Sequence, residues 1–218
     1  MAMIHLEKAG IYLSKPITYI LVLIYLSQSG LLMYLINGKY ELEDQIRYQQ
    51  VQIAEMEEKL KILRVIDDFQ IGFNPSEKVK LANVILNECD RYGYDPLFLM
   101  GLILTESSLR RGQTSSKGAR GLMQVMPMIG RDLADETNVE WASNETLFDF
   151  EANIKIGSLH LFRQILKFES VDKGLISYNH GETALRRHIR KNNPLPRDYL
   201  RKVISKYQEL KERYDILS

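Results

Sequence analysis

An uncharged run near the N-terminus constrains this chain more than any other feature. Residues 17–36 read ITYILVLIYLSQSGLLMYLI and contain no Asp, Glu, Lys or Arg. About 20 such residues span the hydrocarbon core of a bilayer as a single helix, which satisfies its own backbone hydrogen bonds there. The run therefore predicts a transmembrane helix, although Ser27, Gln28, Ser29 and Gly30 make its middle less apolar.

The charges beside this run predict its orientation. Lys8 and Lys15 precede it, whereas only Lys39 follows it closely. Because cytoplasmic flanks carry the excess of Lys and Arg, we expect residues 1–16 to be a short cytoplasmic N-terminus and the rest of the chain to be exported. A cleaved signal peptide is the rival interpretation, but the run is longer than a usual signal core and no small-x-small cleavage site follows. A buried core helix ranks below both.

Residues 40–69 change abruptly to charged residues and glutamine. Apolar residues recur there in alternating steps of four and three, which is the spacing of a coiled-coil seam. The seam positions are Leu42, Ile46, Ile53, Met56, Leu60 and Leu63, with Gln49 interrupting them. Two interpretations stay open: self-association through residues 40–69, or a single amphipathic helix that separates the following domain from the membrane.

A helical domain is predicted from residue 72 to residue 218. Asn74, Pro75 and Glu77 form a helix start with a capping box, so we place the domain boundary near Ile71 and Gly72. Apolar spacing then predicts helices that end at Gly93 and Glu106 and helices over 129–134, 152–168, 172–178, 183–189 and 198–214. No alternating strand pattern is present, so the expected fold class is all-α.

Charge, cysteine content and histidine spacing argue against several kinds of site. The net charge is +1, which provides no field directed at nucleic acid, so no nucleic-acid partner is expected. The single cysteine, Cys89, lies in an apolar helical pattern and is expected to be an inert core thiol. His180 and His188 lack the spacing of metal ligands, and we expect neither a metal nor a cofactor.

Residues 101–127 carry the chemistry. An apolar run ends at a single carboxylate, Glu106, and a loop containing Gly112 and Gly118 follows. The chain then returns to an apolar segment, 121–126. A carboxyl group held against apolar surroundings keeps its proton near neutral pH, because burial disfavours the charged form. The pattern therefore predicts a proton-donating acid beside a groove, although an isolated Glu in such a position is more often a surface charge.

Several ordered motifs together resemble the lytic transglycosylases, the soluble-lytic-transglycosylase and goose-lysozyme-like group. The resemblance covers residues 80–207 and rests on Glu106-Ser107, Ser115, Gly118-Ala119, Gly121-Leu122-Met123-Gln124, Met126-Pro127, Asn153-Ile154 with Gly157, Ser177-Tyr178-Asn179-His180-Gly181 and Arg197-Asp198-Tyr199. Arg110-Arg111 stand where the family commonly has Asn/Asp-Pro. The combination of motifs is specific, whereas a lone Glu-Ser would carry no information.

This resemblance implies a lysozyme-like helical domain that cleaves the β-1,4 bond between N-acetylmuramic acid and N-acetylglucosamine in peptidoglycan glycan strands. Glu106 would be the single general acid and base, and the product would carry a 1,6-anhydro ring. Glycosidases usually need two carboxylates, but an N-acetyl group of the substrate can replace the second. The other nearby acids, Asp132, Asp135, Glu136 and Asp149, are more simply explained as solvated helix or cap residues.

The remaining motif residues receive roles from their chemistry. Ser115 and Gln124 offer hydrogen bonds to acetamido and hydroxyl groups, and Gly121 allows close approach of the backbone. The substrate-binding candidates are Ser115, Gly121, Met123, Gln124, Met126, Tyr178, Asn179 and Tyr199. Met123 and Met126 would supply apolar lining, with core packing an equal alternative for each. Tyr178 would bond Glu106 or an acetamido group, Asn179 would orient that turn, and Tyr199 would stack on a sugar, although tyrosines of this kind are more often packing residues.

A basic stretch follows these motifs, formed by Arg186, Arg187, Arg190, Lys191 and Arg197. Such runs are usually solvated helix faces, but this one could meet the carboxylates of a peptide stem. The leading hypothesis is a lytic transglycosylase anchored in the bacterial inner membrane with its catalytic domain in the periplasm. A goose-type lysozyme that adds water and a non-catalytic scaffold of the same fold are the alternatives.

Overall fold

The computed structural model of this chain describes residues 4–5, 12–69 and 72–215. The chain divides into two compact units, Met1–Glu55 and Met56–Ser218. In the first unit, strands β1 (Ile4–His5) and β2 (Tyr12–Leu13) pair antiparallel, with Ile4 opposite Leu13 and His5 opposite Tyr12. The remainder of this unit is the first part of helix α1 (Lys15–Phe69).

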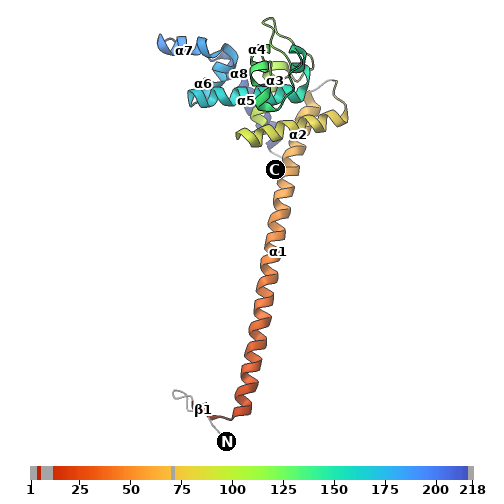
Figure 1. Cartoon of the computed structure of the whole chain (residues 1–218), viewed down its shortest axis with the longest axis vertical. Coiled ribbons are helices and arrows are strands. Elements are labelled where there is room, and N and C mark those ends of the chain that lie inside the picture. Colours follow the sequence, from red (N-terminus) through yellow and green to blue (C-terminus); the bar gives the residue numbers. More distant parts are fainter. Residues whose placement is uncertain (1–3, 6–11, 70–71, 216–218) are drawn as a thin grey trace. The chain divides into compact units, whose positions relative to one another are not determined.

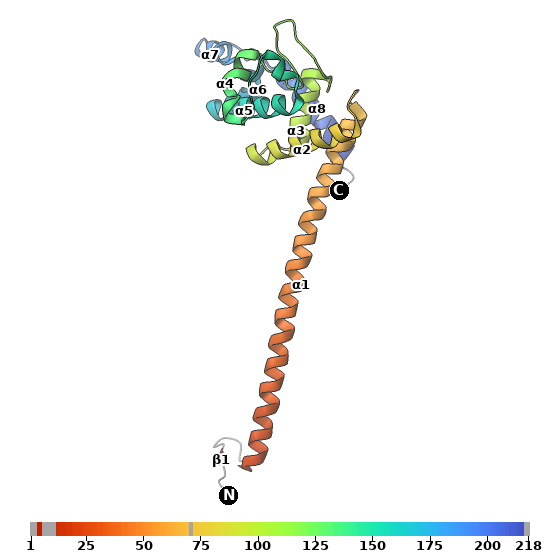
Figure 2. The same cartoon turned by 45° about the vertical axis from the view of Figure 1, so that its right-hand side comes forward.

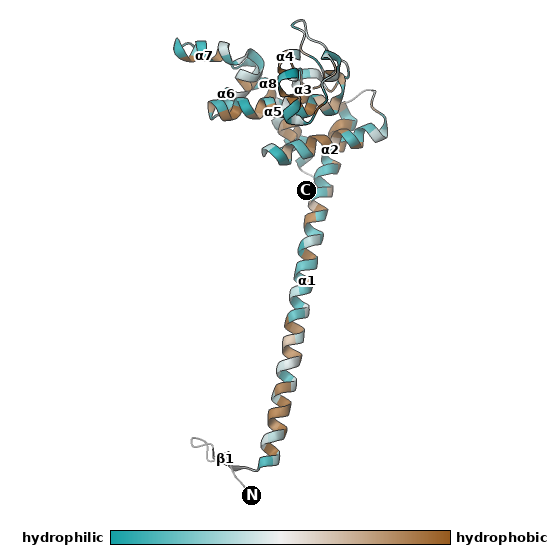
Figure 3. Cartoon of the chain, viewed as in Figure 1, coloured by the Kyte–Doolittle hydropathy of each residue, from teal (hydrophilic) through white to brown (hydrophobic). Residues whose placement is uncertain are grey.

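Helix α1 is continuous, whereas separate segments were expected over residues 17–36 and 40–69 (Figure 1). The intervening residues, including Gly38, are helical. Among the described residues, α1 is the one helix long and apolar enough to cross a membrane, and its apolar window is not buried. Figure 3 shows this apolar region in brown along the N-terminal part of α1. The transmembrane role of residues 17–36 stays a prediction.

The second unit is helical, as the sequence predicted. It contains α2 (Pro75–Tyr92), α3 (Pro96–Ser107), α4 (Pro127–Leu133), two short 3₁₀ turns η1 (Asp135–Thr137) and η2 (Asn144–Phe148), α5 (Phe150–Phe168), α6 (Val171–His180), α7 (Glu182–Arg190) and α8 (Asp198–Tyr214). The caps read from the sequence are present: Asn74 and Glu77 form the capping box of α2, and Gly93 ends it in the left-handed region. The Cys89 side chain is buried, and burial raises the pKa of its thiol.

The core of the second unit includes the last turns of α1. Ile62, Val65 and Ile66 are fully buried in the same apolar cluster as the later helices. The Lys61 ammonium also pairs with the Asp215 carboxylate at 2.7 Å. The compact unit therefore begins at Met56, whereas the sequence placed the domain start at residue 72. The connection expected at Ile71 lies outside the described residues.

Because of this packing, fewer positions of the seam predicted over residues 40–69 are accessible. Leu63 packs against the core, whereas Leu60 is exposed. The seam positions from Leu42 to Leu60 are accessible on α1 within the described part of the chain. Self-association through residues 40–69 stays a prediction, with fewer positions available to it.

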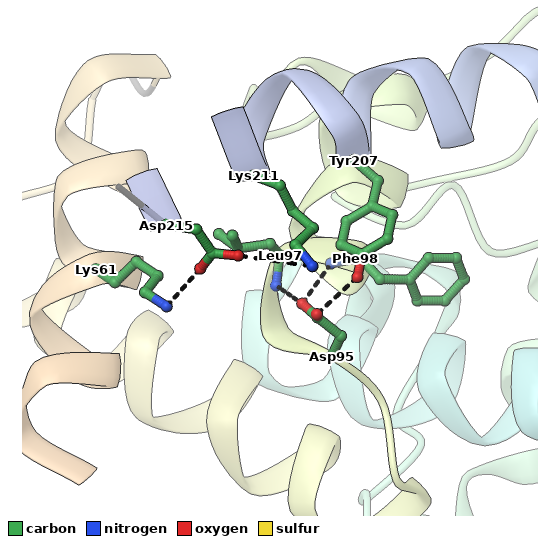
Figure 4. Close-up of polar contacts among 7 residues, drawn as sticks. All are labelled: Lys61, Asp95, Leu97, Phe98, Tyr207, Lys211 and Asp215. Carbon is green, nitrogen blue, oxygen red and sulfur yellow. Dashed lines mark hydrogen bonds and ion pairs between the residues drawn. The ribbon is translucent and has the colours of Figure 1, made fainter. Parts of the chain in front are cut away.

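Helices α3 and α8 run antiparallel and in close contact. At one end of the pair, the Tyr207 hydroxyl of α8 donates to Asp95, the residue that caps the start of α3 (Figure 4). In the middle, Gly101 lies so close to α8 that an added Cβ would be 3.1 Å from the Tyr207 nitrogen. Tight packing here brings the end of α3 against the beginning of α8, where Glu106 and Tyr199 lie.

The opposite side of the domain is organised by α5, which contacts α2, α4, α6 and η2 (Figure 2). Apolar side chains at helical spacing bury one face of α5, among them Ile154, Ile156 and Leu161. Three polar residues are buried with them: Asn153, Ser158 and Gln164. A buried polar side chain is tolerated only when it is hydrogen-bonded, so each of these marks a specific contact with a neighbouring segment.

Candidate functional site

The carboxyl group of Glu106 has the properties expected of a proton donor. Glu106 lies in the last turn of α3, a helix whose residues from Leu97 to Leu104 are all buried. Desolvation in this apolar setting raises the pKa of the carboxyl group to about 7, although a hydrogen bond from Tyr199 acts to lower it. A carboxylic acid with this pKa is substantially protonated at neutral pH, so it can donate a proton and later accept one.

Tyr199 supplies the hydroxyl that contacts the acid. Its hydroxyl donates to Oε1 of Glu106 at 2.5 Å, and the residue is 8 % exposed. The sequence assigned this contact to Tyr178 as one option and gave Tyr199 a role in stacking on a sugar. Because the ring of Tyr199 is buried and its hydroxyl is engaged with Glu106, the structure favours a role in orienting the acid.

The loop after Glu106 begins with an uncommon backbone conformation. Ser108 and Leu109 both have positive φ, 52° and 59°, and the Leu109 side chain is fully buried. Non-glycine residues rarely adopt this region, so burial of Leu109 holds the chain reversal in place. Further along, the Ser115 nitrogen donates to the Ala119 carbonyl at 2.9 Å, and the Ser115 hydroxyl accepts from the Ala119 nitrogen at 3.0 Å.

The turn containing Gly121 packs directly on α5. Gly121 has a φ of +78°, and an added Cβ would collide with the Leu147 carbonyl and the Asn153 side chain. Asn153 is fully buried and satisfies three backbone groups: it accepts from the Met123 nitrogen at 2.7 Å and donates to the carbonyls of Arg120 and Leu147. Gly121 is therefore required for close packing of the turn on α5.

Met123 connects this turn to α6. The Tyr178 hydroxyl donates to the Met123 carbonyl at 2.7 Å, which uses the hydroxyl that the sequence offered to Glu106 or the substrate. The Met123 side chain lies in the core, where Gly157 leaves space for it; a Cβ on Gly157 would be 2.7 Å from the Met123 sulfur. Of the two roles weighed for Met123, the structure therefore favours core packing over groove lining.

The other predicted binding residues divide by exposure. Gln124 has a φ of +50°, and its amide nitrogen donates to the carbonyls of Gly121 and Gln113, so its amide oxygen is the group directed to other partners. Met126 and Asn179 are exposed, and Ser115 is half-buried. These residues can meet a ligand, whereas Gly121, Met123, Tyr178 and Tyr199 shape the site through internal contacts.

Two residues of α5 were missed as site residues. Asn153 appeared in a motif without a role, and His160 was not considered. The His160 ring lies 5.1 Å from the Tyr178 ring, and burial lowers the pKa of His160 to about 4, so it is neutral at physiological pH. Asn153, Gly157, His160 and Gln164 recur at helical spacing, and this polar or small stripe on an apolar face was the available signal.

The other candidate acids have structural roles. The Asp149 carboxylate caps α5 by accepting from the Ala152 nitrogen at 2.9 Å, and Glu136 forms an ion pair with Arg163. Asp132 is exposed beside Arg131. The pKa of Glu106 is shifted by burial and by Tyr199, without a contribution from any of these carboxylates. Of the acids weighed from the sequence, Glu106 is thus the one whose buried surroundings raise its pKa toward neutral pH.

Comparisons with known proteins show the family of the chain. The sequence profile of the family described as Transglycosylase SLT domain matches residues 83–201, more than half of the chain. A protein named transglycosylase, from Enterobacteria phage PRD1, is 33 % identical over 91 residues, which are 42 % of this chain and 31 % of that protein.

Two solved structures share the fold. An inactive mutant of the lytic transglycosylase Slt from Pseudomonas aeruginosa superposes with a TM-score of 0.55 and 18 % identity, covering 71 % of this chain and 30 % of that one. The 70 kDa soluble lytic transglycosylase from Escherichia coli gives a TM-score of 0.55 and 19 % identity, covering 68 % and 25 %. The chain spans less than a third of the length of each of these three proteins. The motifs, the helical fold and the family profile agree: the chain belongs to the transglycosylase SLT domain family.

Proposed function

We propose that this protein is a peptidoglycan lytic transglycosylase in which Glu106 is the single general acid and base. The observation that carries the proposal is the raised pKa of Glu106, about 7, in a site where the Tyr199 hydroxyl holds the carboxyl group. Such a group can donate a proton and take one back within the same catalytic cycle. The family membership and the fold support the same reaction class.

The proposed reaction has two steps. Glu106 first protonates the glycosidic oxygen, while the N-acetyl carbonyl oxygen of the muramic acid attacks the anomeric carbon and the leaving sugar departs. The Glu106 carboxylate then removes the proton of the 6-hydroxyl group of the same sugar. The 6-oxygen attacks the anomeric carbon, the acetamido group is released, and a 1,6-anhydro ring closes. Glu106 ends the cycle protonated, and no water is consumed.

Hydrolysis by the same fold is the second candidate. A goose-type lysozyme would require a base that activates water, but Asp149 and Glu136 are engaged in a helix cap and an ion pair. The intramolecular 6-hydroxyl group also has a high effective concentration relative to water. These observations favour ring closure.

Muropeptide analysis tests the proposal. Purified cell wall is digested with the wild-type protein, Glu106→Gln and the control Glu136→Gln, and the products are identified by mass spectrometry. We expect anhydro ends, lighter by one water than reducing ends, from the wild type and the control, and a loss of about 10²–10⁴-fold in rate for Glu106→Gln. Mainly reducing ends would identify a hydrolase. Full activity of Glu106→Gln would reject the single-acid mechanism, and an inactive but glycan-binding wild type would identify a scaffold.

Location follows from the N-terminal helix in this proposal. Residues 17–36 would hold the protein in the inner membrane as a single-pass anchor, with the SLT domain in the periplasm, where its substrate lies. The support is the length and apolar character of α1 together with the lysines that precede the run. Glycan strands and the membrane are then the two partners, and the exposed seam positions of residues 40–69, from Leu42 to Leu60, would provide a surface for self-association.

A further inference from the structure

One strongly charged surface is not used by the site described above. Residues 182–197, here called the basic arm, comprise α7 and the turn that leads to α8. The arm contains the cations Arg186, Arg187, Arg190, Lys191 and Arg197, and a single carboxylate, Glu182. It therefore concentrates more positive charge than the net +1 of the whole chain.

Most of these cations are not neutralised by the protein. Glu182 is shared by Arg186 and Lys167, at 2.7 and 2.6 Å. Arg187, Arg190 and Lys191 have no acidic partner among residues 12–69 and 72–215. These three exposed cations, in the last turn of α7 and at its C-cap, repel each other, and an anionic ligand would reduce that repulsion.

The arm also has a shaped surface. Thr183, Arg186, Arg187, Ile189 and Arg190 line a shallow cavity of about 550 Å³. Ile189 is 47 % exposed there, whereas Leu185, one helical turn earlier, is buried and attaches α7 to the domain. Guanidinium groups, a hydroxyl and an aliphatic side chain on one cavity fit a peptide that bears carboxylates and small apolar side chains.

The chain connections of the arm relate it to the residues around Glu106. The arm begins four residues after Tyr178 and ends two residues before Tyr199, so both of its ends are attached to elements that form the site. In both whole-chain views α7 lies at the edge of the domain beyond α6 (Figures 1 and 2). The His188 ring nitrogen donates to the Pro194 carbonyl at 2.9 Å, which holds the turn back against α7.

We propose that the basic arm binds the carboxylates of the peptide stem carried by the glycan strand. This rests on the proposed function, because the stem is attached to the glycan strand on which the protein would act. Helix α7 has 9 residues and is therefore about 14 Å long. An extended peptide of about four residues covers the same length, so one stem can contact several cations at once.

The experiment compares two substrates with the full-length chain in detergent micelles. One substrate is peptidoglycan with intact stems, and the other is glycan strands from which an amidase has removed the stems. The variant is Arg187→Gln/Arg190→Gln/Lys191→Gln, in which glutamine preserves helix propensity. The control, Lys59→Gln/Arg64→Gln/Lys173→Gln, removes the same charge from positions on α1 and α6 that also lack an acidic partner within the described residues.

The arm variant should lose at least about tenfold in kcat/KM on intact peptidoglycan and less than about twofold on stripped strands. The control should match the wild type on both. Equal losses on the two substrates, or no loss on intact stems, would overturn the proposal. The proposal would also be overturned if the arm variant lost binding to vesicles of phosphatidylglycerol but kept its kcat/KM on both substrates, because the arm would then be a lipid-binding surface.

A measurement without turnover separates this proposal from the proposed function. Fluorescence anisotropy of a labelled L-alanyl-D-glutamyl-meso-diaminopimelyl-D-alanine peptide is followed with the wild type, the arm variant and the control. If the arm variant loses this binding and the control keeps it, the result supports peptide binding by the arm, even if no anhydro product forms. Equal binding by all three proteins, or no binding by the wild type, would contradict peptide binding by the arm. Anhydro products from stripped strands would still support the catalytic proposal.

Discussion

At the residue scale, the proposed chemistry depends on one carboxyl group and one hydroxyl group. Burial at the end of α3 raises the pKa of Glu106 to about 7, and the Tyr199 hydroxyl at 2.5 Å opposes that rise. The two effects have opposite signs, because burial disfavours the carboxylate and a donated hydrogen bond favours it. The pKa of Glu106 is therefore raised by the apolar packing around α3 and partly lowered again by Tyr199 from α8.

The pH dependence of catalysis follows from this balance. The first step of the proposed mechanism needs protonated Glu106, so kcat/KM of the wild type should fall as pH rises through about 7. Tyr199→Phe removes the donor that stabilises the carboxylate, so the pKa of Glu106 should rise and the alkaline limb should move to higher pH. Tyr207→Phe, on the same helix but bonded to Asp95, is the control. An alkaline limb that stays in place or moves to lower pH in Tyr199→Phe would contradict this assignment.

The same pKa predicts a pH-dependent gain in stability for Glu106→Gln. The pKa of Glu106 rises from 4.5 in the unfolded chain to about 7 in the folded one, so folding is penalised once the unfolded chain ionises. The penalty is absent below pH 4.5, grows between the two values and is complete above about 7. The variant should therefore be more stable than the wild type by about 1–3 kcal/mol at pH 8 and equal to it at pH 4. Thermal unfolding at both pH values measures this, with the exposed Glu212→Gln as control; a gain of the same size at pH 4 would argue against it.

At the element scale, α5 is the helix against which the loop of the site packs. Asn153 satisfies three backbone groups from the 120–123 turn and from η2, and Gly157 leaves room for Met123. Met123 in turn accepts the hydrogen bond of Tyr178 from α6. A single polar side chain on α5 thus determines where the turn lies relative to α6.

Asn153→Ala should therefore destabilise the protein and weaken catalysis together. It leaves the Met123 nitrogen and two carbonyls without partners in a buried setting, which costs about 2–4 kcal/mol. Chemical denaturation gives the free energy of unfolding, and digestion of cell wall gives kcat/KM. Asn193→Ala, in an exposed turn, is the control. A change of less than about 0.5 kcal/mol for Asn153→Ala would show that the turn does not depend on this residue.

At the scale of the whole molecule, the last turns of α1 belong to the core of the second unit. Ile62, Val65 and Ile66 are fully buried, and Lys61 pairs with Asp215 near the end of α8. Within the second unit, the chain before residue 72 therefore contributes to the stability of the helices that carry the site, through α8 in particular.

A comparison of two fragments tests this contribution. Residues 56–218 should unfold cooperatively, whereas residues 72–218 lose three buried aliphatic side chains. Each is worth about 1.5–3 kcal/mol, so the shorter fragment should lose about 5 kcal/mol or more, which is comparable with the entire stability of many domains. Thermal unfolding monitored by circular dichroism measures the difference. Equal midpoints for the two fragments would show that the core does not need α1.

Membrane attachment is a prediction about the other unit. The uncharged run of residues 17–36 should keep the full-length protein in the membrane fraction after washing with alkaline carbonate, and a reporter fused after Ser218 should be located outside the cytoplasm. Replacing Leu23 and Leu32 with arginine should release the protein into the supernatant, since a charge at the bilayer centre costs about 2.5–3.5 kcal/mol. A soluble mature chain that begins near Asn37 would instead indicate a cleaved signal peptide.

The local structure of this protein was readable from its sequence because it depends on neighbouring residues. The capping box at Asn74 and Glu77, the glycine that ends α2 and the bounds of α8 are all correct, since caps and apolar spacing act within a few residues. The motifs likewise led to Glu106 and to the family. His160 was missed because a lone histidine in a helix carries no local signal of its contact with Tyr178.

The partners of each site residue were decided by tertiary packing alone. Glu106 and Tyr199 are 93 positions apart, and Tyr178 bonds Met123 across 55 positions, so sequence spacing could not decide which tyrosine reaches the acid. Ile62, Val65 and Ile66 likewise pack in the core, although the sequence analysis placed their helix outside the domain. The sequence by itself determined the helices of the second unit, the position of Glu106 at the end of one of them, and the family, because these follow from local pattern. The tertiary structure decided which side chains meet and where the compact unit begins, because those depend on how the helices pack in three dimensions.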